Sequence, residues 1–495
     1  MQPKHLTVAY MADFFQNRLI LAVHRQLQLF EWRVKTQTIL LLTLSLAIHG
    51  GPVQCQTPQL FEEKVLLNNI STPWGFTFIN SDELLFTEKR GKLFWYQIST
   101  DSMVEISKVP AVSQSGQGGL LDVALHPDFN NNSFVYLTYA ISAPGGQTTA
   151  LGRGRLAGNM LDSFTELFQA LPVRNSGQHF GSRIVFDNNR FLYMSVGDRG
   201  LPETAQDKNT HLGKVLRFND DGTVPKDNPL VGVPDSKPEI YCWGNRNIQG
   251  MAVHPVSGEV YAHEHGPRGG DELNLIKPNY NFGWPAVTFG VNYDGSQITP
   301  DTTLPGMQLP ITYWVPSIAP SGMTFLRNSQ SSNEADILIG ALAGTHIHWL
   351  KIKDNKRVSA TRSMNGYARF RDIRQAPDGK IYAMTETPNR LVLLRSNVPV
   401  FTGVEDMAGP ALLPAVCYPS PMEDISHIEF ELPSQGPVRV QLFNTGGICV
   451  KEIAQGNFRA GSHHLTFETK DLQPGIYFIK IQQDGAQSVL KSVKY

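Results

Sequence analysis

The chain has 495 residues, of which 41% are hydrophobic and 18% are charged. This composition is ordinary for a soluble globular protein, and the length exceeds a single hydrophobic core. The 43 basic and 44 acidic residues leave a formal net charge of −1, which argues against binding to nucleic acid or to an anionic membrane. The four cysteines form no CxxC pair, which argues against a zinc site or a disulfide-dense scaffold.

The N-terminus has the pattern of an export signal. Arg33 and Lys35 precede the apolar run 38–48, and small or polar residues follow it, in the order of a secretory signal peptide. The run is shorter than the about 20 residues that a membrane span needs. The segment before the run is longer than an ordinary signal start, so a later start such as Met11 stays open. We assign residues 1–56 to an N-terminal extension and signal peptide, and we expect a secreted or cell-surface protein.

One pattern recurs through residues 57–397. An alternating apolar strand runs into a turn with Pro, Asp or Asn, and a second strand follows, which is the pattern of a β-hairpin. Six copies begin roughly 45 to 75 residues apart, close to the size of a propeller blade with inserted loops. The copies cover 74–96, 120–139, 182–197, 249–265, 321–352 and 370–395. We therefore predict an all-β chain whose main domain, 57–397, is a six-bladed β-propeller.

Long insertions separate some of these hairpins, at 198–248 and 266–320. Loops on a rigid scaffold are where binding and catalytic sites are built. Glycines in such loops let the backbone approach a ligand closely. The Gly266-Pro267 turn, with Asp271 and Glu272 nearby, offers hard oxygen ligands suited to calcium. The other polar, glycine-containing segments are 116–119, 177–181, 197–200, 243–250 and 281–285.

A connector at 398–418, rich in Pro, Gly and Ala, leads into a β-rich module at 419–495. The alternating strands of this module predict a small β-sandwich. Cys417 and Cys449 either pair with each other or remain separate thiols. The motifs YPSP, RVQLFNTGG, GSHHLTF and LQPGIYFIKI resemble the C-terminal sorting domain of type IX secretion, with Ser420-Pro421 in place of the usual Asn-Pro. This resemblance implies the type IX secretion machinery as a partner.

The segment from about Leu67 to Arg395 resembles the aldose sugar dehydrogenases that depend on pyrroloquinoline quinone (PQQ), the glucose/sorbosone dehydrogenase family. The motifs that carry the resemblance are TPWGF, GQGGLLDVALHPDF, HFGSRIVFD, SVGDRG, THLGKVLRF, EHGPRGGDELNLI, VNYDG, PSIAPSGM and RFRDIRQAPDG. So many motifs in one order make the resemblance highly specific. It implies a six-bladed propeller, PQQ and calcium as cofactors, and oxidation of an aldose at C1 to the lactone. The electron acceptor and the preferred sugar are not implied.

The resemblance also assigns roles to single residues. His179 would be the general base that takes the proton of the anomeric hydroxyl while hydride leaves C1 for the quinone. Asp198 would hold the other ring nitrogen, and Arg246 would polarise the quinone oxygen. The residues implied in cofactor binding are Gln117, Arg246, Asn247, Tyr293, Ala343, Gly344, Thr345, Arg369 and Arg371. The carbonyls of Gly266 and Pro267 would bind the calcium beside PQQ, and Glu272 with the Phe282 carbonyl would bind a second, structural calcium.

The chain departs from the family pattern at a few positions. The turn 342–345 stands where some soluble glucose dehydrogenases have a lysine that contacts the cofactor, so the PQQ carboxylates lose one cation there. Gln178 replaces an acidic residue found in some members, and Phe282 stands where Tyr is common. Arg369 and Arg371 have a simpler alternative role, which is to pair with Asp372 or Glu386.

Two other functions compete with sugar oxidation. One is a calcium-dependent lactonase-type hydrolase, which holds calcium in the central channel through side chains from several blades. The other is a non-catalytic propeller that binds glycan or protein. The combination of His179, Asp198 and Arg246 favours the dehydrogenase. The run His263-Glu264-His265 looks like a metal cluster, but a third ligand is not evident from the sequence.

Overall fold

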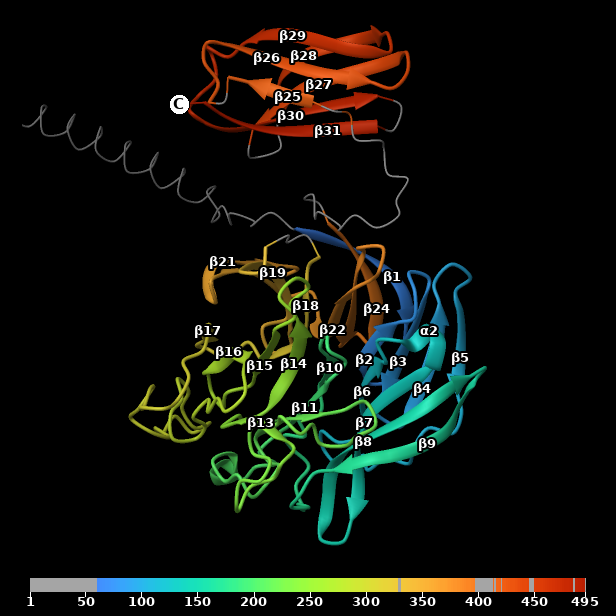
Figure 1. Ribbon diagram of the computed structural model, residues 1–495, viewed down its shortest axis with the longest axis vertical. Helices are drawn as coiled ribbons and strands as arrows, with labels where there is room; N and C mark the ends of the chain where they lie inside the picture. The colour runs from blue at the N-terminus through green and yellow to red at the C-terminus, as the bar shows by residue number, and fades with distance from the viewer. Residues whose placement is uncertain are drawn as a thin grey trace, which may run out of the picture.

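The computed structural model describes residues 60–327, 331–396, 413, 415–419, 421–444, 449–483 and 486–494. The predicted signal peptide and Cys55 lie outside the described residues, as does most of the predicted connector. The regular secondary structure of the described residues is almost all strand (Figure 1), and the two short helices among them are α2 (Phe129–Asn132) and the 3-10 helix at Pro202–Ala205. The all-β prediction is confirmed.

Antiparallel sheets of four strands make up the chain from Phe61 to Ser396. There are six of them among the described residues. The first contains β2 (Pro73–Phe78), β3 (Glu83–Glu88), β4 (Lys92–Gln97) and β5 (Ser102–Ile106), and the second β6 (Leu120–Leu125), β7 (Phe134–Ala143), β8 (Gly146–Ala157) and β9 (Met160–Gln169). The third contains β10 (Ile184–Phe186), β11 (Leu192–Val196), β12 (Lys214–Phe218) and β13 (Ile240–Trp243), and the fourth β14 (Ile248–Val253), β15 (Val260–Glu264), β16 (Asp271–Ile276) and β17 (Thr312–Trp314). The fifth contains β18 (Pro320–Phe325), β19 (Glu334–Ala341), β20 (Ile347–Lys353) and β21 (Lys356–Ser363), and the sixth β22 (Arg369–Gln375), β23 (Ile381–Glu386), β24 (Arg390–Ser396) and β1 (Phe61–Asn68).

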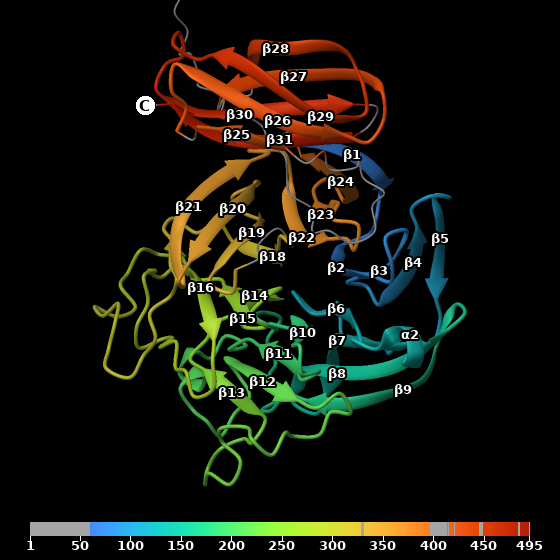
Figure 2. The same ribbon diagram turned by 45° about the horizontal axis from the view of Figure 1, so that its top comes forward.

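The first strands of these sheets form a closed ring. β2 contacts β6, and the contacts continue through β10, β14 and β18 to β22, which contacts β2 again. Figure 2 shows the sheets arranged around a common axis. The N-terminal strand β1 pairs with β24, so the two ends of the segment share one sheet. A ring closed in this way is a β-propeller, and it leaves no long unpaired strand edge at the closure.

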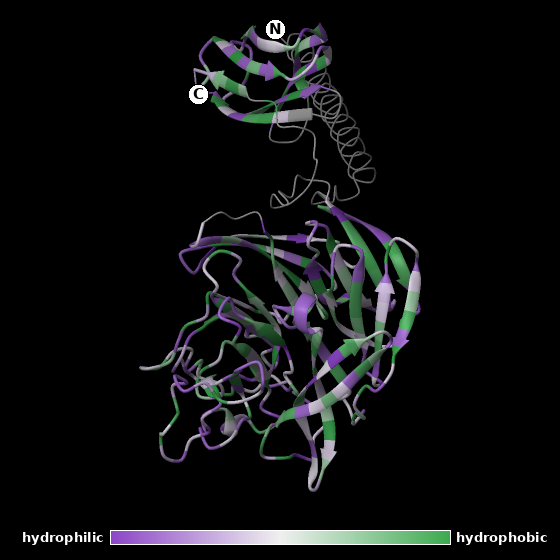
Figure 3. Ribbon diagram, turned by 45° about the vertical axis from the view of Figure 1, so that its right-hand side comes forward, coloured by the Kyte–Doolittle hydropathy of each residue, from purple (hydrophilic) through white to green (hydrophobic). Residues whose placement is uncertain are grey.

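Apolar side chains between neighbouring sheets hold the ring together. Phe76 and Phe86 of the first sheet share a buried cluster with Tyr382 and Met384 of the sixth. Similar clusters join the other neighbouring sheets. Successive residues of an inner strand enter different clusters, because side chains of a strand point alternately to its two faces. Ile381 and Ala383 of β23 belong to one cluster, and Tyr382 and Met384 belong to the next. Figure 3 shows the hydropathy of the residues along the strands.

The C-terminal module consists of two sheets. One has the order β25 (Ala415–Tyr418), β26 (Ile425–Leu432) and β29 (Gly461–Glu468). The other has the order β28 (Cys449–Phe458), β27 (Gly436–Asn444), β30 (Gly475–Gln483) and β31 (Ala486–Lys494). Both sheets contribute to one core, with Phe430 from the first and Val440 and Ile479 from the second. Cys417 and Cys449 are both free thiols.

No helix in the described part of the chain is long and apolar enough to cross a membrane.

Candidate active site

A cavity of about 260 Å³ lies on the axis of the ring. Each of the six innermost strands, or a residue within a few positions before it, contributes to its wall. The lining residues are Trp74, Lys89, Gln117, Leu121, Phe180, Gly181, Asn247, Gln249, His265, Ala319, Leu342, Arg369 and Arg371. Four of the predicted cofactor ligands, Gln117, Asn247, Arg369 and Arg371, therefore come together in one place.

His179 and Asp198 form a buried pair beside this cavity. The Nδ1 of His179 lies 2.6 Å from the Oδ1 of Asp198, and the two residues are 8% and 1% exposed. His179 has a φ of 55°, in the left-handed region that non-glycine residues rarely occupy and that is frequent at functional sites. Its backbone N–H donates to the Oε1 of Gln117 at 2.8 Å. With Nδ1–H directed at the carboxylate, Nε2 is the nitrogen that can accept a proton.

The Asp198 carboxylate is held from several sides. The Nε1–H of Trp284 donates to its Oδ2 at 2.9 Å, and the N–H of Gly200 donates to its Oδ1 at 2.8 Å. Burial raises the pKa of Asp198, but the hydrogen bonds and positive charge of its neighbours, His179 first, outweigh this and leave the pKa below its usual value. The carboxylate therefore stays ionised and can stabilise a positive charge on the imidazole.

Arg246 lies on the loop before β14, next to the pair. Its Nη1 donates to the carbonyls of His265 at 3.1 Å and Gly266 at 3.0 Å, and its guanidinium lies 5.5 Å from the centre of the Trp284 ring. Its carbonyl accepts the N–H of Asp198 at 2.8 Å, and its own N–H donates to the Glu264 carboxylate. The loop is thus tied to both the His179–Asp198 pair and the Gly266 turn.

The predicted arginine pair lines the opposite side of the cavity. The Nε atoms of Arg369 and Arg371 lie 3.3 Å and 2.7 Å from the carboxylate of Glu386. Burial raises the pKa of Glu386, but the two arginines outweigh this effect and lower it. Glu386 is therefore their ion-pair partner, while Asp372 pairs with other arginines. Both arginines still line the cavity, so pairing with Glu386 does not remove them from it.

The remaining predicted cofactor ligands are less central. The N–H groups of Ala343 and Gly344 donate to the Ile318 carbonyl, and these two hydrogen bonds fix the turn. Thr345 is the last residue of the turn and has a φ of 47°. Leu342 is the residue of this turn that lines the cavity. Tyr293 is 72% exposed and is not among the residues of the wall, so its contact with a cofactor stays a prediction.

The Gly266-Pro267 turn is shaped by Asp271. The Asp271 carboxylate accepts the N–H of Gly266 at 2.9 Å and the N–H of Ile318 at 2.8 Å. Asp271 is therefore committed to the backbone of this turn. The carbonyl of Gly266 accepts from Arg246, and a carbonyl oxygen has a second lone pair for a cation. The turn fits the role predicted for it, with its backbone oxygen beside the cavity residue His265.

A cluster of buried oxygen atoms surrounds Glu272. Glu272 lies directly opposite Glu264 in the β15–β16 pair, and burial followed by the charge of Glu264 raises the pKa of Glu272. The Oδ1 atoms of Asn245 and Asn274 are buried here without a hydrogen-bond partner among the described residues. The amide nitrogens of these two residues donate to the carboxylates of Glu264 and Glu272. Two carboxylates and two unpaired amide oxygens make a donor set that fits calcium.

Phe282 and the two histidines of the run 263–265 were the other candidates for metal ligands. The Phe282 ring packs in the core with Ile248 and Ala262, so only its carbonyl is suited to the predicted ligand role. The His265 Nε2 lies 2.7 Å from the Pro320 carbonyl, and burial lowers the pKa of His265 to about 3. The two ring nitrogens of His263 are buried and have no hydrogen-bond partner among the described residues. In the described part of the chain, no group of three or more His, Cys, Asp or Glu side chains is placed to hold a metal.

Sequence reasoning missed three residues that the structure brings to the site. They are Trp284, which holds Asp198, Glu264, which holds the Arg246 loop, and Lys89, which lines the cavity. Trp284 and Glu264 belong to polar segments that the sequence had singled out, but their partners lie 86 and 18 positions away. Lys89 had no distinguishing pattern.

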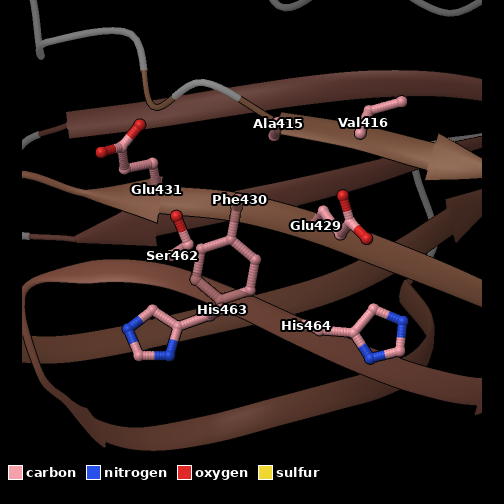
Figure 4. A pocket seen from close by; sticks show the side chains of 8 residues that line it. All are labelled: Ala415, Val416, Glu429, Phe430, Glu431, Ser462, His463 and His464. Carbon is pink, nitrogen blue, oxygen red and sulfur yellow. The ribbon is translucent and has the colours of Figure 1, made fainter.

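A separate hollow of about 460 Å³ lies on the C-terminal module (Figure 4). Strands β25, β26 and β29 form it, and its side chains include Glu429, Phe430, His463 and His464. The His463 ring stacks on Phe430 with a centroid distance of 5.4 Å. None of these residues belongs to the sites above.

Comparison with known proteins gives the family of each part. Residues 70–394 match the sequence model of the glucose / sorbosone dehydrogenases. The chain belongs to this family. The resemblance stated from the motifs is therefore confirmed. Residues 416–495 match the secretion system C-terminal sorting domain, which implies export of the protein.

Individual relatives agree with this assignment. The aldose sugar dehydrogenase YliI of Escherichia coli is 34% identical over 354 residues, which cover 70% of this chain and 94% of the relative. A solved glucose dehydrogenase structure superposes with a TM-score of 0.65 at 35% identity and covers 68% of this chain and all of that one. The PQQ-bound aldose sugar dehydrogenase of Streptomyces coelicolor gives a TM-score of 0.57 at 26% identity and covers 68% of this chain and 99% of that one. This member of the glucose/sorbosone dehydrogenase family thus shares the propeller of its relatives over almost their full length.

Proposed function

We propose that this chain is a PQQ- and calcium-dependent dehydrogenase that oxidises aldose sugars at C1 to the lactone. The observation that carries the proposal is the buried His179–Asp198 pair at 2.6 Å, next to a cavity whose wall carries Lys89, Arg369 and Arg371. A proton acceptor beside a cationic cavity suits the oxidation of a neutral alcohol in the presence of an anionic cofactor. The names of the relatives, which include sugar dehydrogenases and a PQQ-bound structure, support the same activity.

The residues of the chain would act on the substrate as follows. The Nε2 of His179 would take the proton of the C1 hydroxyl, and the ionised Asp198 would stabilise the imidazolium that results. When bound, PQQ would supply an electrophilic quinone as hydride acceptor, and calcium would supply a Lewis acid. Arg246 lies between the pair and the Gly266 turn, where its guanidinium would stabilise negative charge.

Other side chains would hold the cofactors. Arg369 and Arg371 would pair with carboxylates, and Gln117 and Asn247 would donate hydrogen bonds from the cavity wall. The carbonyls of Gly266 and Pro267 would bind one calcium ion. The buried cluster around Glu272 would bind the second, structural calcium.

We also propose how the chain is divided into domains. Six four-stranded sheets in a closed ring support a six-bladed propeller over residues 57–397, and two sheets around one core support a sandwich over 419–495. Residues 398–418 would be the linker. The sorting domain supports export by the type IX secretion machinery through the periplasm, to the cell surface or the medium.

The hydrolase alternative has a specific observation against it. A lactonase-type propeller needs calcium in the central channel, held by side chains. In this chain the guanidinium of Arg183 lies 3.2 Å from Asp122 and 3.3 Å from Asp372, and all three side chains are at most 1% exposed. These carboxylates face a buried cation of the protein itself, which disfavours a metal between them. A propeller that only binds glycan or protein would not need the buried His179–Asp198 pair, so this pair disfavours the non-catalytic alternative.

Reconstitution tests the proposal. The purified protein is loaded with PQQ and calcium, and reduction of a redox dye is followed with a panel of aldoses. The wild type should reduce the dye with at least one aldose, and His179→Ala should bind PQQ but turn over roughly 10² to 10⁴ times more slowly, the usual effect of losing a general base. Full turnover in His179→Ala would show that the base is a different residue. No dye reduction with any aldose by a wild type that binds PQQ would rule out the proposed reaction.

A further inference from the structure

Lys89 is a third cation in the cavity wall. It follows β3 directly and lines the cavity together with Arg369 and Arg371, which come from a different sheet. Its Nζ donates to the carbonyl of Gly116 at 3.0 Å, the residue before Gln117. An ammonium group has three donors, and this is the one protein acceptor that Lys89 Nζ has among the described residues. The remaining donors are available to a ligand in the cavity.

The charges around Lys89 favour an anionic ligand. The cavity wall carries three cations, and Glu386 is the carboxylate that pairs with Arg369 and Arg371. Burial lowers the pKa of Lys89, and the positive charge of Arg371 lowers it further, whereas the negative charge of Glu386 opposes them only in part. A negative group in the cavity would oppose both effects, because Glu386, which also pairs with two arginines, does not outweigh them for Lys89.

We propose that Lys89 pairs with a carboxylate of bound PQQ and replaces the cation that the turn 342–345 does not provide. The inference rests on the proposed function, since it requires PQQ in the cavity. PQQ carries three carboxylates, and Arg369 and Arg371 share their charge with Glu386. A third cation on the first sheet, which neighbours the sixth sheet in the ring, would let two adjacent sheets contact the carboxylates of the cofactor.

If Lys89 only stabilises the protein structure, its loss should affect PQQ binding in a different way from the loss of a charge pair. Its hydrogen bond to Gly116 could simply anchor the loop that carries Gln117. Loss of such an anchor would weaken cofactor binding equally at all salt concentrations. Loss of a charge pair weakens binding most at low salt, because mobile ions screen the pair in the wild type at high salt. The salt dependence of PQQ affinity therefore separates the two roles.

The test uses Lys89→Gln, which removes the charge but keeps a hydrogen-bond donor. The matched control is Arg90→Gln, one position further on. Arg90 pairs with Glu88 at 2.9 Å, has a side chain 49% exposed and does not belong to the cavity wall. PQQ is titrated into the apo-protein at a fixed saturating calcium concentration, in low salt and in 1 M salt, with binding followed by protein fluorescence. Thermal melting checks that all three proteins are folded.

At low salt, Lys89→Gln should weaken PQQ binding at least about tenfold, as expected for a lost charged hydrogen bond. The difference from the wild type should shrink at 1 M salt, and Arg90→Gln should bind as the wild type does. Equal affinity of Lys89→Gln and the wild type would overturn the inference, as would a loss of the same size at both salt concentrations. A wild type that binds no PQQ would instead overturn the proposed function.

Discussion

The indole N–H of Trp284 lies 2.9 Å from the Oδ2 of Asp198, so the carboxylate that holds His179 is itself held through its other oxygen. The Trp284 ring also lies beside the guanidinium of Arg246. One buried tryptophan thus contacts both the carboxylate that holds the predicted base and Arg246, which is predicted to polarise the quinone oxygen. This places Trp284 as a positioning residue, because it acts on the substrate only through Asp198 and Arg246.

The variant Trp284→Phe should lower kcat about tenfold and change KM little. The phenyl ring keeps most of the packing, but Asp198 loses a donor and no longer holds His179 as firmly, which affects the reacting geometry more than substrate binding. Steady-state kinetics of the reconstituted protein measure both constants.

The control for this prediction is Trp349→Phe. The Nε1 of Trp349 donates to Asp336 at 2.8 Å, so this variant removes the same type of bond away from the cavity. Its kcat should equal that of the wild type. An unchanged kcat in Trp284→Phe would mean that Gly200 and His179 alone fix the carboxylate.

Replacing either cavity arginine should weaken PQQ binding by at least about tenfold. Arg371→Ala should also lower the thermal melting temperature more than Arg369→Ala does. The Arg371 side chain is 12% exposed and the Arg369 side chain 41%, so loss of Arg371 leaves Glu386 with less compensation inside the protein. Titration of PQQ and thermal melting of the two variants provide the measurements.

Arg362→Ala serves as the control, because Arg362 is exposed on β21. It should change neither PQQ affinity nor melting temperature by much. If both cavity variants bind PQQ as tightly as Arg362→Ala, the two arginines form ion pairs with Glu386 and do not bind the cofactor.

Calcium should stabilise the protein more at pH 8 than at pH 5. Burial raises the pKa of Glu264 to about 7 and raises that of Glu272 as well. In the unfolded chain these carboxyls ionise near pH 4.5, so the calcium-free folded state binds more protons than the unfolded state above that pH. Its stability therefore falls as the pH rises from about 4.5 through 7. Calcium bound by the ionised carboxylates would remove this loss.

Melting temperatures with calcium and with a chelator, at both pH values, measure the effect. Glu272→Gln should reduce the calcium-dependent gain at pH 8, because a ligand and one charge are removed. An equal gain at the two pH values would place the structural calcium away from these carboxylates.

Removal of the chain from about Pro419 onward should leave an active propeller. The C-terminal module has its own core, which includes Phe430, Val440 and Ile479, and none of its described residues lines the cavity. Dye-linked activity of the purified truncated protein should match that of the full chain, whereas release from the native host should be lost. Normal release of the truncated protein would rule out the sorting role.

Local patterns were enough to predict most of the propeller. Each predicted hairpin coincides with neighbouring strands of one sheet, as at 74–96 and β2 to β4, because alternation and turn residues are local properties. The strand β1 was not predicted, since it is defined by pairing with β24 more than 300 positions away. Outer strands such as β5 and β21 were also missed, because exposed strands carry little apolar alternation.

The site was predictable only in part for a related reason. Motifs located Gln117, Asn247, Arg369 and Arg371, which do line one cavity. Lys89 and Trp284 act through partners on other sheets, and sequence spacing does not reveal such pairs. The exposure of the Tyr293 side chain could not be predicted, because a motif fixes a residue's position along the loop but not the direction in which its side chain points.

A single-turnover measurement shows whether this chain transfers a hydride from an aldose to PQQ with His179 as the base. The protein loaded with PQQ and calcium is mixed without oxygen with an aldose, and the absorbance of the cofactor is followed with C1-protonated and C1-deuterated sugar. We expect reduction of the cofactor, one lactone formed per cofactor, a slower reaction with deuterium, and a much slower reaction in His179→Ala. An unchanged cofactor spectrum with every aldose tested would contradict this expectation.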